Sequence, residues 1–111
     1  MELRISFRHM EASPSIESKI ADKVQHLKKY FRGKMKIDWV CSVEPHQHIC
    51  EVNIKVDHLN FHAHASDRDL YHCLDLVIEK LEKQLRRKND KLNDKIHSSK
   101  KLGENRETEF I

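Results

Sequence analysis

Residues 69–92 read DLYHCLDLVIEKLEKQLRRKNDKL, and in this stretch apolar side chains recur every three or four positions. That spacing is the period of an α-helix with one buried face. Asp67 suits the N-cap just before the pattern begins, and the apolar positions continue as far as Ile96. The sequence therefore predicts a long amphipathic helix over about residues 68–96.

A shorter helix is predicted nearer the N-terminus, over about residues 14–31. Ser13 is a favourable N-cap, and Pro14 follows it at the helical position where proline is well tolerated. Apolar residues recur at helical spacing from Ile16 to Phe31. Gly33 suits the position just after the end of such a helix.

Four further segments alternate between apolar and polar residues, which is the period of a half-buried β-strand. They cover residues 2–8, 37–43, 50–56 and 59–65. Asp57 and His58 separate the last two, and Asp tolerates the positive φ that a tight hairpin turn needs. The order β-α-β-β-β-α predicts an α+β fold, a two-layer sandwich with both helices on one face of a four-stranded sheet.

The length of 111 residues is enough for one compact domain. We expect residues 1–96 to form that domain and residues 97–111, which show no sustained pattern, to form a disordered C-terminal tail. No apolar run approaches the roughly 20 residues that a membrane span needs, so a cytoplasmic location is expected.

Positive charge is concentrated in two segments. Residues 19–36 hold seven basic residues and one acidic residue, and residues 79–101 hold nine basic and four acidic, although the net charge of the chain is only +3. On a helical wheel Lys80, Lys83, Arg87 and Lys91 fall within roughly 80° of one another. A solvated helix face is the simpler interpretation, but the segregation of charge favours a surface that binds a polyanion through its backbone charge and shape.

The run from 69 to 92 strongly resembles the second helix of the ribosome hibernation promoting factor family, also called ribosome-associated inhibitors or sigma-54 modulation proteins. The N-terminal run MELRISFRHMEASPSIESKIADKVQHLKKYF, the strand end at Glu44-Pro45 and residues 61–66 are also similar to that family. The resemblance implies a β-α-β-β-β-α fold with a mixed sheet, similar to double-stranded RNA-binding domains.

The resemblance also implies a function. It suggests a protein, monomeric in solution and not an enzyme, that binds the small ribosomal subunit and contacts 16S ribosomal RNA near the decoding centre. Such a protein excludes messenger and transfer RNA and silences translation under stress or in stationary phase, with no cofactor, membrane or small-molecule substrate. Asp69 and Tyr71 match a signature at the helix start for which we favour a role in capping and packing. By position, the implied rRNA-binding residues are Lys23, Lys29, Lys80, Lys83, Arg86, Arg87, Lys88 and Lys91.

Long members of the family carry a C-terminal dimerisation domain, so this chain resembles a short form. Some short forms promote the pairing of ribosomes, whereas others with an acidic tail inactivate single ribosomes. Residues 98–111 contain no strong acidic run, which favours the pairing type. Inactivation of single ribosomes remains the alternative.

Three other functions have weaker support. An enzyme is disfavoured because the sequence has no glycine-rich phosphate loop, nucleophile elbow or paired-carboxylate motif. A protein-interaction module that regulates the transcription machinery would need an exposed apolar patch, and the apolar residues are used by the predicted core. A metal site lacks any familiar ligand spacing, although six suitable side chains crowd the middle of the chain, namely Cys41, His46, His48, Cys50, His62 and His64.

Overall fold

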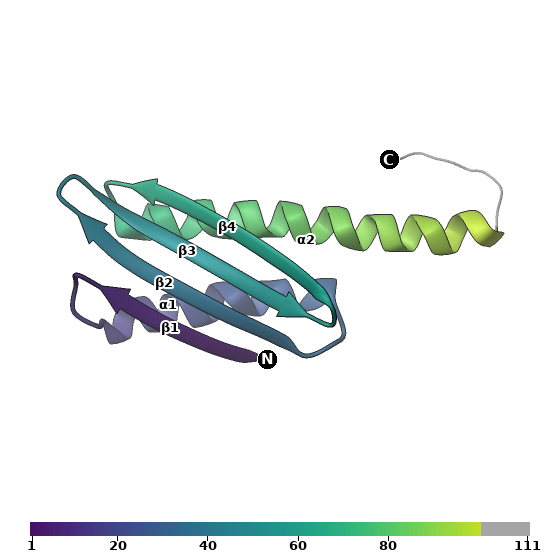
Figure 1. Ribbon diagram of the computed structural model, residues 1–111, viewed down its shortest axis with the longest axis horizontal. Coiled ribbons are helices and arrows are strands. Elements are labelled where there is room, and N and C mark those ends of the chain that lie inside the picture. The colour runs from purple at the N-terminus through teal and green to yellow at the C-terminus, as the bar shows by residue number, and fades with distance from the viewer. Residues whose placement is uncertain (101–111) are drawn as a thin grey trace.

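The computed structural model describes the backbone of residues 1–100 and the side chains of residues 1–91. Two α-helices, a short 3-10 helix and four strands follow one another in the predicted order (Figure 1). The prediction of element types along the chain is therefore confirmed. The elements are β1 (Glu2–Arg8), α1 (Pro14–Gln25), η1 (His26–Tyr30), β2 (Met35–Glu44), β3 (Gln47–Val56), β4 (Leu59–Asp67) and α2 (Leu70–Lys100).

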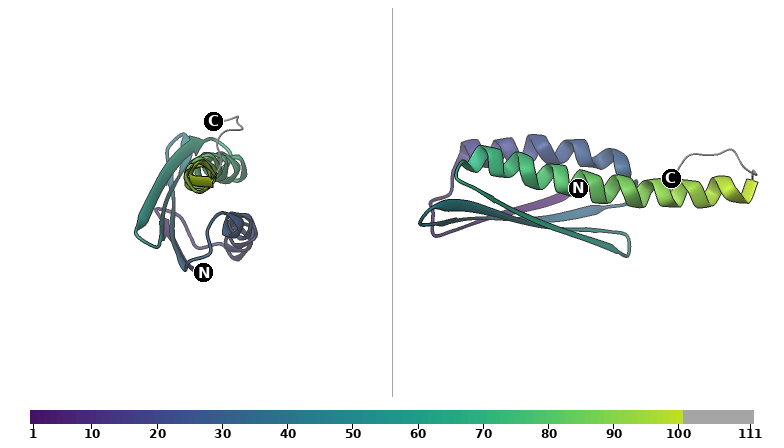
Figure 2. Two further views of the ribbon diagram at one scale, coloured as in Figure 1. Left: turned by 90° about the vertical axis from the view of Figure 1, so that its right-hand side faces the viewer. Right: turned by 90° about the horizontal axis from the view of Figure 1, so that it is seen from above.

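The four strands form one sheet in the order β1-β2-β3-β4. The first two strands pair in parallel, because α1 carries the chain back between them, and the other neighbours pair antiparallel. Both helices lie on the same face of the sheet, as the end-on view in Figure 2 shows. The predicted two-layer α+β fold with a mixed sheet is confirmed.

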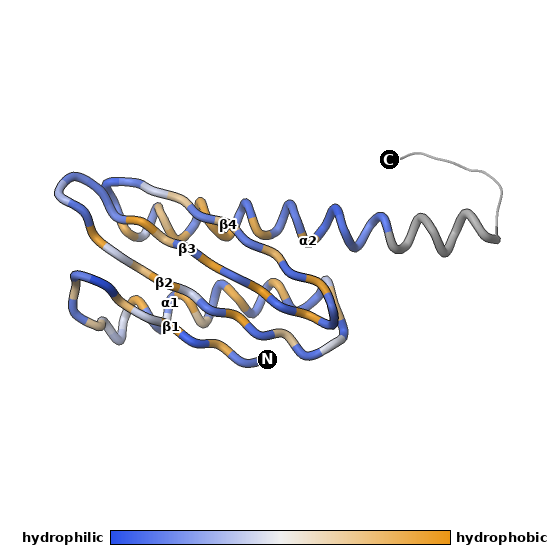
Figure 3. Tube along the Cα trace, viewed as in Figure 1, coloured by the Kyte–Doolittle hydropathy of each residue, from blue (hydrophilic) through white to orange (hydrophobic). Residues whose placement is uncertain are grey.

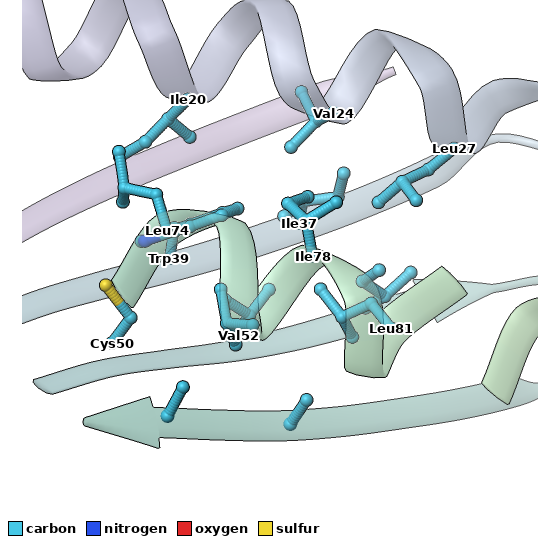
Figure 4. Close-up of a cluster of buried hydrophobic side chains, with 14 of the residues drawn as sticks. Ile20, Val24, Leu27, Ile37, Trp39, Cys50, Val52, Leu74, Ile78 and Leu81 are labelled. Carbon is cyan, nitrogen blue, oxygen red and sulfur yellow. The ribbon is translucent and has the colours of Figure 1, made fainter. Parts of the chain in front are cut away.

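The core lies between the inner face of the sheet and the apolar stripes of the two helices. Figure 3 shows the alternation of apolar and polar residues along the strands that produces this inner face. Trp39 of β2 is fully buried, with Ile20 of α1 and Leu74 of α2 close to it (Figure 4). Burial of each large apolar side chain contributes about 1.5–3 kcal/mol, so this layer supplies most of the stabilisation.

The start of α1 matches its prediction. Ser13 adopts an extended backbone with φ of −127°, and its hydroxyl oxygen accepts a hydrogen bond from the Ile16 N–H at 3.4 Å. Pro14 occupies the first turn, where no intrahelical partner for an N–H is needed.

The end of this helical segment differs from its prediction. The helix tightens to 3-10 geometry at His26 and stops at Tyr30, because Phe31 is already extended with φ of −145°. Gly33 therefore caps no helix. A Cβ at this position would overlap the carboxylate of Asp57 at the β3–β4 turn, so a larger residue here would require the Asp57 side chain to move. Asp57 itself has φ of 56°, the positive value expected for that turn.

Asp67 was predicted to cap α2, and this is wrong because β4 continues through that residue. The helix begins at Leu70, and the Asp69 carboxylate accepts a hydrogen bond from the Tyr71 N–H at 3.0 Å. Asp67 instead accepts from the Asp69 N–H at 2.9 Å, which lowers the pKa of the Asp67 carboxyl. The predicted capping role of Asp69 is confirmed.

The helix α2 runs to Lys100, four residues past its predicted end at residue 96. The predicted tail from 97 to 111 lies mostly outside the described residues, so the domain boundary stays a prediction. Within residues 1–100, no helix combines the length and the low charge needed to cross a bilayer.

Truncation of Leu81 tests the packing of α2 on the sheet. This side chain is fully buried, and Figure 4 places it near Val52 of β3. Leu81→Ala should lower the free energy of unfolding by about 2–5 kcal/mol, because it removes buried methyl groups and leaves a cavity. Urea denaturation should show a lower midpoint with an unchanged slope. Lys83→Ala, on the exposed side two residues later, should change stability by about 0.5 kcal/mol or less; equal losses in the two variants would contradict this packing.

Candidate polyanion-binding surface

The helices α1 and α2 lie side by side and run in the same direction (Figure 2). Their contacts progress together along both helices. Lys19 lies over the Tyr71 ring, with Nζ 5.7 Å from the ring centroid. Further along both helical segments, Tyr30 contacts Glu82. We call the line of contacts between the two helices the α1–α2 seam.

Acidic side chains of α2 face α1 along the α1–α2 seam. The Lys23 ammonium forms an ion pair with Asp75, and Lys23 is only half-exposed. The Tyr30 hydroxyl donates to the Glu82 carboxylate at 3.2 Å. Glu79 stands four residues after Asp75, on nearly the same side of α2. The side of α2 that faces α1 is therefore mainly acidic.

The opposite flank of α2 faces the edge of the sheet. Lys80 Nζ donates to the backbone oxygen of His64 at 2.7 Å, and Gln84 Nε2 donates to that of His62 at 2.8 Å. Both acceptors belong to β4, which is an edge strand. These two side chains therefore cover part of a sheet edge that would otherwise present unpaired carbonyl groups.

Lys83, Arg87 and Lys91 continue along this outer flank and are all exposed. In the part of the chain with described side chains, none of the three forms an ion pair with a carboxylate. Together with Lys80 they make a row of cations along the helix, as the helical wheel predicts. We call this row the α2 ridge.

The basic residues of the two helices do not form one continuous face. Lys19 and Lys23 of α1 point into the seam, where they contact Tyr71 and Asp75 of α2. The α2 ridge lies on the other flank of α2. The acidic side chains of the seam lie between them. A ligand bound along the α2 ridge would therefore lie on the opposite flank of α2 from Lys19 and Lys23.

The two basic segments approach each other at one end of the seam. Asn89 Nδ2 donates to the backbone oxygen of Tyr30 at 2.6 Å, which joins the end of η1 to α2. Exposed cations lie within a few residues of this contact along the chain, in η1, just after η1 and in α2, and we call them the end cluster. Its members are Lys28, Lys29, Arg32, Arg86, Arg87 and Lys91.

The remaining predicted binding residues take different positions. Lys29 is exposed in η1 with its Nζ 5.3 Å from the centroid of the Tyr30 ring. Arg86 is exposed and stands four residues from Glu82, on the seam side of the helix. Lys88 is half-buried, since it follows Leu81 by seven residues and shares its side of the helix. The α2 ridge thus contains half of the eight residues predicted to bind RNA.

Tyr71 was predicted to help pack the start of α2, and this role stays a prediction. Its side chain is 44% exposed and contacts Lys19 on the surface. Tyr30 and Asn89 were not predicted to matter, although their hydrogen bond joins the end of η1 to α2. Among the described residues, no group of three His, Cys, Asp or Glu side chains is placed to hold a metal ion.

The sequence of residues 3–93 matches the family model described as sigma 54 modulation protein / S30EA ribosomal protein. The chain belongs to this family. The match begins in β1 and ends in α2 just after Lys91, so it includes nearly the whole sheet, all of α1 and the part of α2 that carries the α2 ridge.

Curated relatives differ in how much of their own length this chain covers. The ribosome hibernation promoting factor of Salmonella typhimurium is 32% identical over 92 residues, which are 83% of this chain and 97% of that protein. The Escherichia coli K12 protein of the same name is 29% identical over 92 residues, again 83% of this chain and 97% of the relative. The ribosome hibernation promotion factor of Bacillus subtilis is 26% identical over 99 residues, covering 86% of this chain but only 52% of the relative.

Two solved structures share the fold of this chain. The N-terminal domain of Thermus thermophilus Protein Y superposes with a TM-score of 0.75 at 23% identity, covering 78% of this chain and 98% of that domain. A ribosomal subunit interface protein from Coxiella burnetii superposes with a TM-score of 0.73 at 20% identity, covering 81% and 99% of the two chains. At this level of identity the likeness establishes the arrangement of helices and strands.

Removing the negative charge of Asp75 tests whether this carboxylate keeps Lys23 from binding a polyanion. Asp75→Asn releases the ammonium from its ion pair, so a heparin column should retain the variant to higher salt than the wild type. Stability should change by about 1 kcal/mol or less, because the pair is partly exposed. Asp22→Asn, which removes the same charge from the exposed side of α1, serves as the control. Equal shifts for both variants would show that only net charge matters.

Proposed function

We propose that this chain is a ribosome hibernation factor. In this proposal it binds the small subunit, contacts 16S ribosomal RNA near the decoding centre, and prevents messenger and transfer RNA from binding. It thereby silences translation in the cytoplasm under stress or in stationary phase. Membership of the S30EA family and the printed names of the Salmonella and Escherichia coli relatives support a role in ribosome hibernation.

The observation that carries the proposal is the uncompensated α2 ridge. RNA presents a line of phosphate charges, and a row of cations along one helix flank matches such a line. Lys83, Arg87 and Lys91 are exposed and lie on the flank away from the acidic seam. Binding of this kind depends on backbone charge and shape, as expected for a structured RNA.

The end cluster extends this proposed contact toward α1. Lys29 and Arg86 lie close to the Tyr30–Asn89 hydrogen bond in the sequence, so both reach the same end of the helical layer. Lys23 and Lys88 contribute less in this proposal, because one is paired with Asp75 and the other is half-buried. The α2 ridge is therefore the main RNA contact, and the end cluster supplements it.

Charge reversal on the ridge tests the proposal. The triple variant Lys83→Glu, Arg87→Glu, Lys91→Glu should lose association with purified small subunits in a sedimentation assay. The change replaces attraction to phosphates with repulsion, whereas the three exposed positions leave the core intact. Unchanged circular dichroism would show that the fold is retained, and wild-type binding by this variant would refute the assignment.

A matched control separates the ridge from net charge. The triple variant Arg8→Glu, Lys36→Glu, Lys55→Glu changes the charge equally, at exposed positions on the sheet face that the helices leave uncovered. Lys36 and Lys55 face each other in register, so reversal keeps a like-charged pair. This control should retain most of the binding.

Salt titration measures how many phosphates the ridge neutralises. Binding to the small subunit should weaken linearly on a plot of log affinity against log salt, because each neutralised phosphate releases counterions. Lys83→Ala should reduce the magnitude of that slope by roughly one, and Lys36→Ala should leave it unchanged. An affinity that does not change with salt concentration would indicate a mainly apolar contact.

We also propose that the bound factor promotes the pairing of ribosomes. The support for this is the composition of residues 98–111, which lack a strong acidic run. Sedimentation of ribosomes with and without the protein distinguishes the two modes. Pairing predicts a new, faster peak, whereas inactivation of single ribosomes predicts reduced translation with no such peak.

A further inference from the structure

Three cysteines lie together in the core, apart from the α2 ridge. Cys41 of β2, Cys50 of β3 and Cys73 of α2 are all fully buried and carry free thiols. Figure 4 shows the sulfur of Cys50 on the inner side of the sheet, near Trp39 and Leu74. The RNA-binding proposal uses none of these thiols.

The backbone register sets Cys41 directly opposite Cys50 in the antiparallel pair of β2 and β3. Opposite residues in such a pair alternate between a hydrogen-bonded and a non-hydrogen-bonded arrangement. The second arrangement brings the two Cα atoms to about 4.5 Å and the side chains closer together. The hydrogen bonds at the outer edge of β4 determine which arrangement Cys41 and Cys50 adopt.

Lys80 and Gln84 of α2 bond to the carbonyls of His64 and His62, so those carbonyls point to the outer edge of β4. Ala65 and the alternate residues before it therefore direct their backbone groups toward β3. Cys50, which faces Ala65 in register, bonds in turn to β4 and not to β2. Cys41 and Cys50 consequently form a non-hydrogen-bonded pair. The separation of about 4.5 Å between Cα atoms that is typical of such pairs lies within the range of about 4.4–6.8 Å found in disulfides.

We propose that Cys41 and Cys50 are a redox-modification site, at which a small peroxide produces a reversible cross-strand disulfide while Cys73 stays reduced. The Cys41 thiolate attacks one peroxide oxygen, so that an S–O bond forms, the O–O bond breaks and hydroxide leaves to become water. The Cys50 sulfur then attacks the Cys41 sulfur, so that the S–S bond forms and the S–O bond breaks. The Cys50 proton leaves with this second hydroxide as water.

The surroundings favour this pair over the alternative between Cys50 and Cys73. The hydrogen bond from Cys50 lowers the pKa of Cys41, and the same contact raises the pKa of Cys50 to about 12. Cys73 has its pKa raised by its contact with Cys50, and its thiol donates to the Ala65 carbonyl at 3.2 Å. A thiol that is held protonated is a poor nucleophile, so Cys41 reacts first. Cys50 rather than Cys73 then attacks the oxidised sulfur, because the register places Cys50 directly opposite Cys41. Because Cys41 and Cys50 are fully buried, only oxidants about as small as water can reach them, and the reaction is slow.

Peptide mapping tests the proposal with the intact chain. The protein is treated with hydrogen peroxide under native conditions, unfolded with iodoacetamide present, and digested with trypsin without reduction. Cleavage after Lys36 and Lys55 leaves both reacting cysteines in residues 37–55, and cleavage after Arg68 and Lys80 leaves Cys73 in residues 69–80. We expect the first peptide to lack two hydrogen atoms and the second to carry an alkyl group. Two alkyl groups on the first peptide, or a cross-link between the two peptides, would overturn the proposal.

Thermal unfolding supplies a second measurement. Closing a loop between β2 and β3 restricts the unfolded chain, so oxidation should raise Tm by about 5–10 °C, and dithiothreitol should reverse the rise. Cys73→Ala should retain the rise and Cys41→Ala should lose it. A rise that persists in Cys41→Ala would contradict the assigned pair.

Discussion

The packing of α2 across the inner face of β3 and β4 is the constraint on which the rest of the structure depends. Leu74, Leu81 and the neighbouring apolar side chains fix the rotation of the helix about its own axis. Lys80 and Gln84 fix it further, because they bond to the edge of β4. Once this rotation is set, each polar residue of α2 faces α1, the solvent or the edge strand.

This rotation separates the two signs of charge on a single helix. Asp75 and Glu82 face α1 and find partners there, whereas Lys83 and Arg87 are left without a carboxylate partner in the described part of the chain. An isolated row of cations exerts a stronger field on an approaching polyanion than cations that are interspersed with acids. The fold thus orients charge that the net value of +3 conceals.

Much of the fold followed from local patterns. Ser13 with Pro14 marked the start of α1, alternation marked the strands, and Asp57 marked the hairpin turn, because each depends on nearby residues alone. The start of α2 was misplaced because Asp67 and Asp69 are both able to cap a helix, and only the length of β4 decides between them.

The surface was less predictable than the fold. The helical wheel placed the α2 ridge correctly within its own helix, but it gave no information on which flank faces α1. The ion pair of Lys23 joins residues 52 positions apart, and the Tyr30–Asn89 bond joins residues 59 positions apart. Such contacts arise only from tertiary packing, so the sequence predicted the cations without predicting which of them are compensated.

We propose that the flank of α2 carrying the ridge is the face that meets ribosomal RNA. Chemical acetylation of lysines, mapped by mass spectrometry on the free protein and on its complex with the small subunit, tests that claim directly. If the α2 ridge meets the RNA, Lys83 and Lys91 become protected in the complex while Lys36 and Lys55 on the uncovered face of the sheet stay reactive. Protection of Lys36 and Lys55, with Lys83 and Lys91 still reactive, would contradict it.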